Sequence, residues 1–163
     1  MARKVFFSFH YERDIWRASQ IRNSWVTKPD QEAAGFVDAA SWEEVKKKGD
    51  EAIRKWIRDQ LEGTSVTIVL IGYETHDRKY VGYEIEQSCI RKNGLLGIYI
   101  NGLKDQDDKT DPKGRNPFEK LTMKVDGQNK NLSEIYPCYD WIADKGYENL
   151  GKWIEKAAKD AGR

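Results

Sequence analysis

The stretch RKYVGYEIEQS, residues 78–88, places a carboxylate where chemistry is possible. If the stretch is helical, Val81 and Ile85 share one face, and Tyr80 lies one turn before Glu84 at the edge of that face. A carboxylate partly withdrawn from water can accept hydrogen bonds and offset a developing positive charge. A helix glutamate is more often solvated or paired with a neighbouring cation. The pattern alone leaves both interpretations open.

Other residues that could do chemistry give weaker signals. His10 and His76 are the only histidines, and they lack the HxxxH spacing of a zinc-binding helix. We therefore expect no metal site and place both histidines in solvent-facing loops. Cys89 and Cys138 show no CxxC spacing, which argues against a zinc site or a disulfide framework. Cys89 falls near the buried face of the predicted helix, so we expect it to be a core residue rather than a nucleophile.

The composition is that of a globular protein. The chain has 163 residues, of which 39% are hydrophobic and 34% charged, so we expect a single domain over residues 1–163. A net charge of +1 gives no argument for a nucleic-acid or anionic-membrane partner. No apolar run approaches the roughly 20 residues that span a bilayer, and the N-terminus lacks the apolar core of a signal peptide. We expect a reduced, cytoplasmic setting.

Strands and helices alternate along the sequence. Apolar or β-branched runs predict four strands and a shorter fifth, over residues 4–9, 33–38, 64–72, 94–100 and 138–143. Helical spacing predicts helices over about 14–26, 49–63, 78–93 and 147–162, with Asp14 and Asp50 as N-caps. This alternation predicts a three-layer α/β fold: a parallel, flavodoxin-like sheet of about five strands with helices on both faces.

Two segments fit this alternation less well. Residues 101–120 are dense in Asp, Lys, Gly and Pro and predict a long surface loop. Residues 121–137 are ambiguous, although the DG pair within KVDGQNKN could close a small hairpin.

A parallel sheet binds ligands at the carboxyl ends of its strands. Ser8 and Phe9 end the first predicted strand, His10 follows it, and Asp38 ends the second. The loop after the first strand, SFHYERD, contains no glycine, which argues against a dinucleotide-binding loop, and neither a P-loop nor a GxSxG elbow occurs. Ser8 could cap the turn or bind a ligand, and Asp38 could cap the following turn.

Three sequence boxes resemble TIR (Toll/interleukin-1 receptor) domains. KVFFSFHYERD is similar to their opening strand and loop, and VDAASWEEVKKKGDEAIRKWIRDQLEGTSVTIVLIG follows the next part of their pattern. THDRKYVGYEI resembles the box S-x-W-C-x-x-E-L, with Tyr80 at the Trp position and Glu84 at the position of the NAD-cleaving glutamate. The likeness spans about residues 4–101. It is closer still to the TIR-like proteins of bacterial Thoeris antiphage systems, whose YDWxADxGY tail is also readable, although the segment of about 104–136 is shorter than in that group.

The resemblance implies an NAD-consuming signalling enzyme. Such an enzyme would cleave the bond between nicotinamide and ribose and rejoin the ribose carbon to another oxygen, giving a cyclic ADP-ribose isomer that activates a partner effector. NAD would be its substrate, with no further cofactor, and a phage-derived trigger and self-assembly would be expected. Glu84 would be catalytic, with Ser8, Phe9 and His10 near the substrate.

We expect Asp38, Tyr80 and Tyr83 to contribute to substrate binding, the two tyrosines through stacking on a ring. Phe9, Tyr80, Tyr83 and Trp42 could equally be packing residues. A non-enzymatic interaction module is the main alternative function, and a non-catalytic ligand-binding domain is a third.

Overall fold

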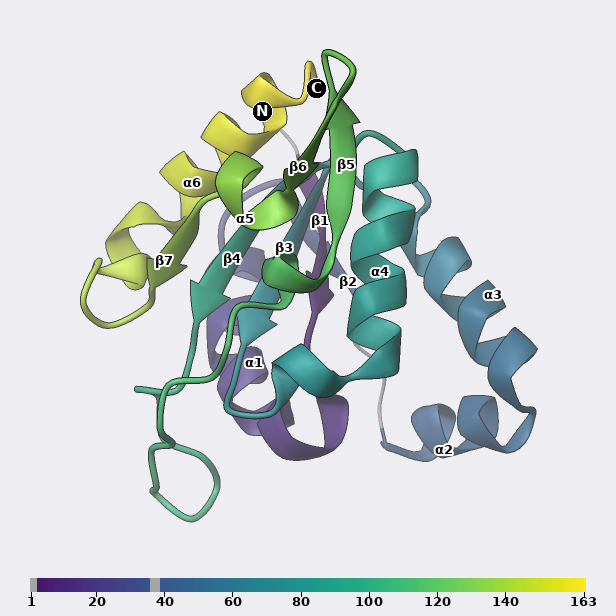
Figure 1. Cartoon of the computed structure of the whole chain (residues 1–163). Helices are drawn as coiled ribbons and strands as arrows, with labels where there is room; N and C mark the ends of the chain where they lie inside the picture. The colour runs from purple at the N-terminus through teal and green to yellow at the C-terminus, as the bar shows by residue number, and fades with distance from the viewer. Residues whose placement is uncertain (1–2, 36–38) are drawn as a thin grey trace.

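A five-stranded parallel sheet organises the molecule (Figure 1). The computed structural model describes residues 3–35 and 39–163. The strands lie in the spatial order β2 (Gln31–Ala34), β1 (Arg3–Ser8), β3 (Val66–Ile71), β4 (Gly94–Tyr99) and β7 (Cys138–Asp140). Every neighbouring pair is parallel. The order reverses between β1 and β3, and this switch point is where such sheets place their ligands.

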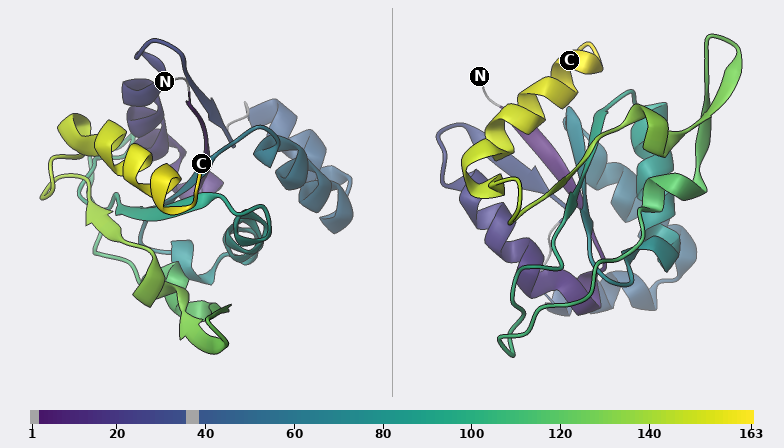
Figure 2. Two further views of the ribbon diagram at one scale, coloured as in Figure 1. Left: turned by 90° about the horizontal axis from the view of Figure 1, so that it is seen from above. Right: turned by 60° about the vertical axis from the view of Figure 1, so that its left-hand side comes forward.

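Helices cover both faces of the sheet, as Figure 2 shows from two further directions. On one face, α1 (Tyr11–Val26) and α6 (Gly146–Asp160) pack on Phe7, Ile68 and Leu96. On the other face, α4 (Lys79–Ile90) packs on Val69 and Ile71, and α3 (Asp50–Leu61) packs on Phe6. Alternate residues of each central strand thus face opposite layers, as a strand buried on both sides requires. The predicted three-layer α/β fold is confirmed.

Shorter elements complete the chain. α2 (Ala39–Lys47) lies beside α3, and the 3₁₀ turn η1 (Thr75–Asp77) precedes α4. After β4, residues 101–116 form the expected long loop. The turn η2 (Pro117–Lys120), the antiparallel hairpin of β5 (Thr122–Val125) and β6 (Gln128–Asn131), and α5 (Leu132–Ile135) follow in that order. The hairpin turns at Asp126 and Gly127, both with positive φ, as the DG pair indicated.

Three local expectations were wrong. Asp14 does not cap a helix, because α1 begins at Tyr11 directly after the first strand and puts Asp14 inside its first turn. Asp50 is the first residue of α3, and Gly49 occupies the cap with a φ of 96° that suits glycine. The second strand begins two residues earlier than predicted and runs over Gln31–Ala34, while residues 36–38 of the predicted range lie outside the described residues. Asp38 itself lies outside the described residues.

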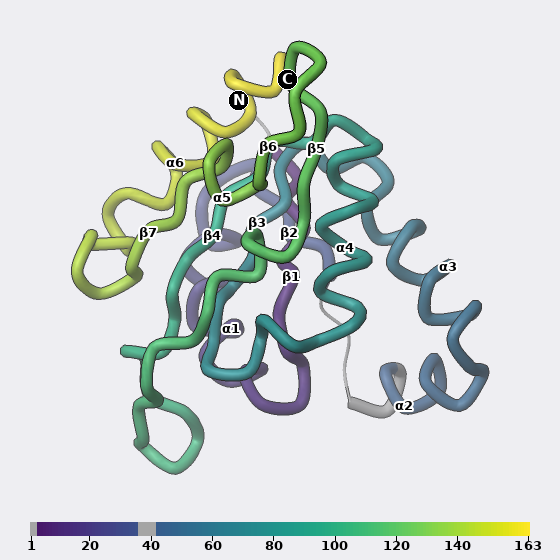
Figure 3. Tube along the Cα trace, in the orientation of Figure 1, coloured from purple at the N-terminus to yellow at the C-terminus, as the bar shows by residue number. Residues whose placement is uncertain are grey.

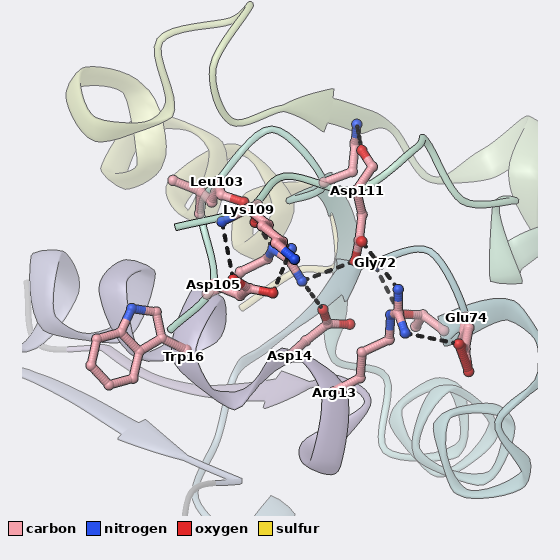
Figure 4. Close-up of polar contacts among 12 residues, drawn as sticks. Arg13, Asp14, Trp16, Gly72, Glu74, Leu103, Asp105, Lys109 and Asp111 are labelled. Atoms are coloured by element: carbon pink, nitrogen blue, oxygen red, sulfur yellow. Dashed lines mark hydrogen bonds and ion pairs between the residues drawn. The ribbon is translucent and has the colours of Figure 1, made fainter. Parts of the chain in front are cut away.

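The long loop is tied to the sheet edge by buried charge. Arg17 of α1 donates from Nη1 to Asp14 Oδ1 at 3.0 Å and lies 3.0 Å from Asp111 Oδ2. It also donates to the carbonyls of Leu103 and Lys109 (Figure 4). Asp14 and Arg17 are both buried. The loop is therefore a fixed part of the carboxyl edge although it contains no helix or strand over residues 101–116.

A tube trace shows where the chain crosses this edge (Figure 3). The carboxyl ends of β1 and β3, the start of α1 and the start of α4 come together there. The Cα trace of α2 lies beside the same region. These elements supply the side chains of the candidate site.

Candidate active site

Glu84 lies beneath the switch point of the sheet. It stands in the second turn of α4, and its helix neighbours Val81 and Ile85 are buried against β3. This packing draws Glu84 inward until only 7% of it is exposed. Ser8, the last residue of β1, is fully buried and donates from Oγ to Oε1 of Glu84 at 3.0 Å. The structure thus brings together two residues that lie far apart in the sequence and that sequence analysis assigned to one site.

Burial changes the protonation of Glu84. Loss of water raises the pKa of its carboxyl to about 8, and the hydrogen bond from Ser8 opposes this rise. Near pH 7 the carboxyl is therefore mostly neutral. A cation placed beside it would lower the pKa again, because opposite charges favour the ionised form. The site therefore holds a carboxyl that ionises in response to positive charge.

A small cavity opens beside Glu84. Its volume is about 100 Å³. Aromatic side chains line it: Phe9, Tyr11, Trp42 and Trp56. Neighbouring rings are in contact, since Tyr11 and Trp42 have centroids 5.5 Å apart, as have Trp42 and Trp56. The cavity is thus a mostly apolar chamber with one buried carboxyl in its wall, a setting in which electrostatic effects are stronger than in water.

His10 borders the same cavity. Contrary to expectation, both His10 and His76 are buried, at 8% and 9% exposure, because the folded edge covers the loops that carry them. The His10 Nδ1 lies 3.5 Å from Glu12 Oε2 but makes no hydrogen bond within the described chain. Burial, followed by the positive charge of Arg78, lowers the pKa of His10. The ring is therefore neutral near pH 7.

The two tyrosines of the α4 box occupy different places. Tyr80 lines the cavity, and its hydroxyl donates to Asp50 Oδ1 at 2.6 Å. Tyr83 does not line it: its hydroxyl accepts from Arg58, and its ring lies 4.7 Å from the guanidinium carbon of Arg54. Tyr83 is therefore engaged with α3, where it packs rather than faces the chamber.

Two cations at the cavity were not anticipated. Arg78, the residue before α4, and Lys46 of α2 both line it. Lys46 also pairs with Glu12, which in turn accepts from the indole of Trp42. Arg78 could have been found from sequence, because it is the first residue of the stretch RKYVGYEIEQS, which was expected at the carboxyl edge of the sheet. Lys46 gave no such signal, since only the packing of α2 brings it there.

The described residues contain no group of three or more His, Cys, Asp or Glu that could hold a metal ion. No helix within residues 3–35 and 39–163 is long and apolar enough to cross a membrane. The position predicted for substrate contact at Asp38 lies outside these ranges, so that role stays a prediction.

The sheet order, with a buried glutamate and an aromatic chamber at the switch point, defines a TIR-like α/β domain. Comparison with known families agrees. The model of "Thoeris protein ThsB, TIR-like domain" matches residues 6–105, and the chain belongs to that family. It is 37% identical over 191 aligned positions to a protein of Bacillus cereus (strain MSX-D12) named "Putative cyclic ADP-D-ribose synthase ThsB1". That alignment covers 94% of this chain and all of the relative.

Proposed function

We propose that this chain is an antiphage-defence enzyme that converts NAD to a cyclic ADP-ribose isomer and nicotinamide. One observation carries the proposal: a buried carboxyl, Glu84, bonded to Ser8 in the wall of an aromatic chamber at the ligand-binding edge. The name of the Bacillus cereus relative, which assigns it cyclic ADP-D-ribose synthesis, supports the same chemistry.

Glu84 would act on the ribose that loses nicotinamide. Nicotinamide in NAD is already cationic, so its departure needs little acid catalysis and leaves an oxocarbenium-like sugar. The positive charge of the bound ring would lower the pKa of Glu84 and ionise it. The resulting carboxylate would accept hydrogen bonds from the ribose hydroxyls and offset the charge of the transition state. Ser8 would hold Oε1 in position.

The chamber would bind the leaving group and its ribose. Phe9, Tyr80 and the Tyr11–Trp42 pair offer ring faces or edges to nicotinamide. His10, neutral and with an unbonded Nδ1, offers a hydrogen bond to a hydroxyl. Arg78 and Lys46 would pair with the pyrophosphate, which guanidinium and ammonium groups bind well. Tyr83 is assigned no contact with substrate.

Cyclisation requires an internal oxygen to replace nicotinamide. The bond from the ribose carbon to the ring nitrogen breaks with its electron pair leaving on nicotinamide. A hydroxyl oxygen of the same ADP-ribose then bonds to that carbon and loses its proton to solvent, so no water is consumed. The largely apolar lining of the chamber, once closed over the substrate, would limit access of water and favour this outcome over hydrolysis.

A trigger would open the site. The chamber of about 100 Å³ is below the several hundred Å³ typical of ligand sites, so we expect its walls to move when NAD binds. We propose that a phage-derived trigger, together with self-assembly, drives that movement. The product would then diffuse to a partner effector.

Mass spectrometry of nucleotides from infected cells tests the proposal. Cells carrying the chain should lose NAD and accumulate nicotinamide and a cyclic ADP-ribose isomer, whereas cells lacking it should not. If infected cells are protected while NAD stays intact and no cyclic product forms, the chain acts as an interaction module instead.

A further inference from the structure

A second and larger cavity lies at the opposite, amino edge of the sheet. Its volume is about 400 Å³, within the range of roughly 300–1,000 Å³ typical of small-molecule sites. It lies among the end of α4, the start of β4, the second half of α6 and the segment around α5. None of its lining residues borders the chamber of Glu84. The two cavities are separate.

The wall of this second cavity is aromatic and apolar. Tyr136, Tyr139 and Trp153 supply rings, and Tyr139 and Trp153 stack with centroids 4.2 Å apart and planes 6° apart. Leu95 and Met123 add apolar surface. A flat aromatic molecule would replace water against these groups with favourable burial and ring contacts.

Positive charge lies at the rim. Lys92 and Lys156 both line the cavity, and Lys156 is paired with Asp160 at 2.6 Å. The ammonium of Lys92 has no ion-pair partner within the part of the chain that the structure describes. The rim therefore carries one uncompensated positive charge, which favours a ligand with one negative charge.

The backbone at Lys92 adds an independent observation. The α4 helix ends in a Schellman motif, in which the Lys92 amide donates to the Cys89 carbonyl and the Asn93 amide to the Ser88 carbonyl. Lys92 has a φ of 60°, a left-handed conformation in which glycine is normally favoured. A lysine therefore occupies, at the wall of this cavity, a backbone position that glycine would adopt with less strain.

We propose that this second cavity binds a small, planar aromatic molecule that carries a single negative charge. The rings and apolar side chains hold its aromatic part, and Lys92 pairs with its charged group. This site is spatially separate from the chamber of Glu84, because the walls of the two cavities share no residue.

Binding can be measured on the isolated chain with two fluorescent probes of matched shape. 8-Anilinonaphthalene-1-sulfonate carries one negative charge, and N-phenyl-1-naphthylamine is its uncharged counterpart. Both should bind saturably to the folded protein. Ala161→Phe, which fills the cavity, should weaken both by at least about tenfold, because it removes the space they need. Ala143→Phe, on an exposed turn, should change neither.

Lys92→Gly removes the positive charge at the cavity while preserving the backbone conformation. Because it removes the left-handed strain, this variant should have a higher Tm, and it should weaken only the sulfonate probe, by about threefold. Lys145→Gly relieves similar strain (φ 53°) at the far end of α6 and should leave both probes unchanged. The proposal is overturned if neither probe binds saturably, if folded Ala161→Phe binds both normally, or if Lys92→Gly affects the two probes equally.

Discussion

Ser8 Oγ donates a hydrogen bond to Glu84 Oε1 at 3.0 Å across the interface between β1 and α4. Both side chains are buried, and among residues 3–35 and 39–163 only Ser8 makes a hydrogen bond to the Glu84 carboxyl that lowers its pKa. A carboxyl isolated in this way is held by one hydroxyl. The state of that carboxyl therefore depends on Ser8 and on whatever enters the chamber beside it.

Replacing Ser8 tests this dependence. Ser8→Ala removes the hydrogen bond that lowers the pKa of Glu84, so the pKa should rise further and the acid limb of the activity profile should move to higher pH. NAD turnover in extracts of infected cells should fall by about tenfold to a hundredfold at pH 7. Ser8→Thr keeps the hydroxyl and should keep the wild-type pH profile. An unshifted profile in Ser8→Ala would show that Ser8 does not control Glu84.

Stability should fall as pH rises through the range in which Glu84 ionises. The folded pKa of about 8 exceeds the ordinary value of 4.5, so the folded state is at full stability below about pH 4.5 and loses stability up to about pH 8. Between about pH 5 and pH 8 this group should cost roughly 3 kcal/mol. Glu84→Gln should remove that loss. Urea unfolding of both proteins at several pH values gives the difference directly, and parallel curves would refute the burial argument.

Arg17 should be needed for the long loop to fold against the sheet. Arg17→Met leaves the buried Asp14 without its partner and removes the bonds to two loop carbonyls, so it should cost roughly 3–5 kcal/mol. Lys55→Met breaks an exposed pair with Asp59 and should cost less than about 1 kcal/mol. The free energies of unfolding from urea titrations compare the two. Equal small costs would mean that the Arg17 network does not anchor the loop.

Gly72 should tolerate no side chain. A Cβ there would overlap the carboxylate of Asp14, which is itself held by Arg17, so Gly72→Ala should lower the Tm or prevent folding. Gly82, in α4, has open space around the same position, and Gly82→Ala should stabilise the protein by up to about 1 kcal/mol. Thermal unfolding measures both. A neutral Gly72→Ala would show that the edge can relax around Asp14.

The sequence was sufficient to predict the sheet and the helix that carries Glu84, but not the surroundings of Glu84. Apolar runs and helical spacing are local signals, so they predicted the sheet, although the second strand was misplaced, and a helix over about 78–93 that is observed as Lys79–Ile90. Local signals do not show what packs over a side chain. The burial of His10 and the cavity role of Lys46 both depend on distant elements, and α2 was not predicted at all.

The tyrosine pair shows the same limit within one box. Tyr80 and Tyr83 are three residues apart on α4, and sequence analysis assigned both to substrate. The structure separates them, because Arg54 and Arg58 of α3 engage Tyr83, while Tyr80 borders the chamber. The packing of α3 against α4 therefore determines which of the two tyrosines faces the chamber.

The most direct test of the account is the cyclic product formed by Glu84→Gln in infected cells. Glu84→Gln keeps the shape of the buried side chain but cannot ionise, whereas Glu86→Gln makes the same change on the exposed side of α4. With equal protein levels confirmed, nucleotide mass spectrometry should find the cyclic ADP-ribose isomer with the wild type and Glu86→Gln, and none with Glu84→Gln. Normal product from Glu84→Gln would contradict the assignment of Glu84 as the catalytic residue.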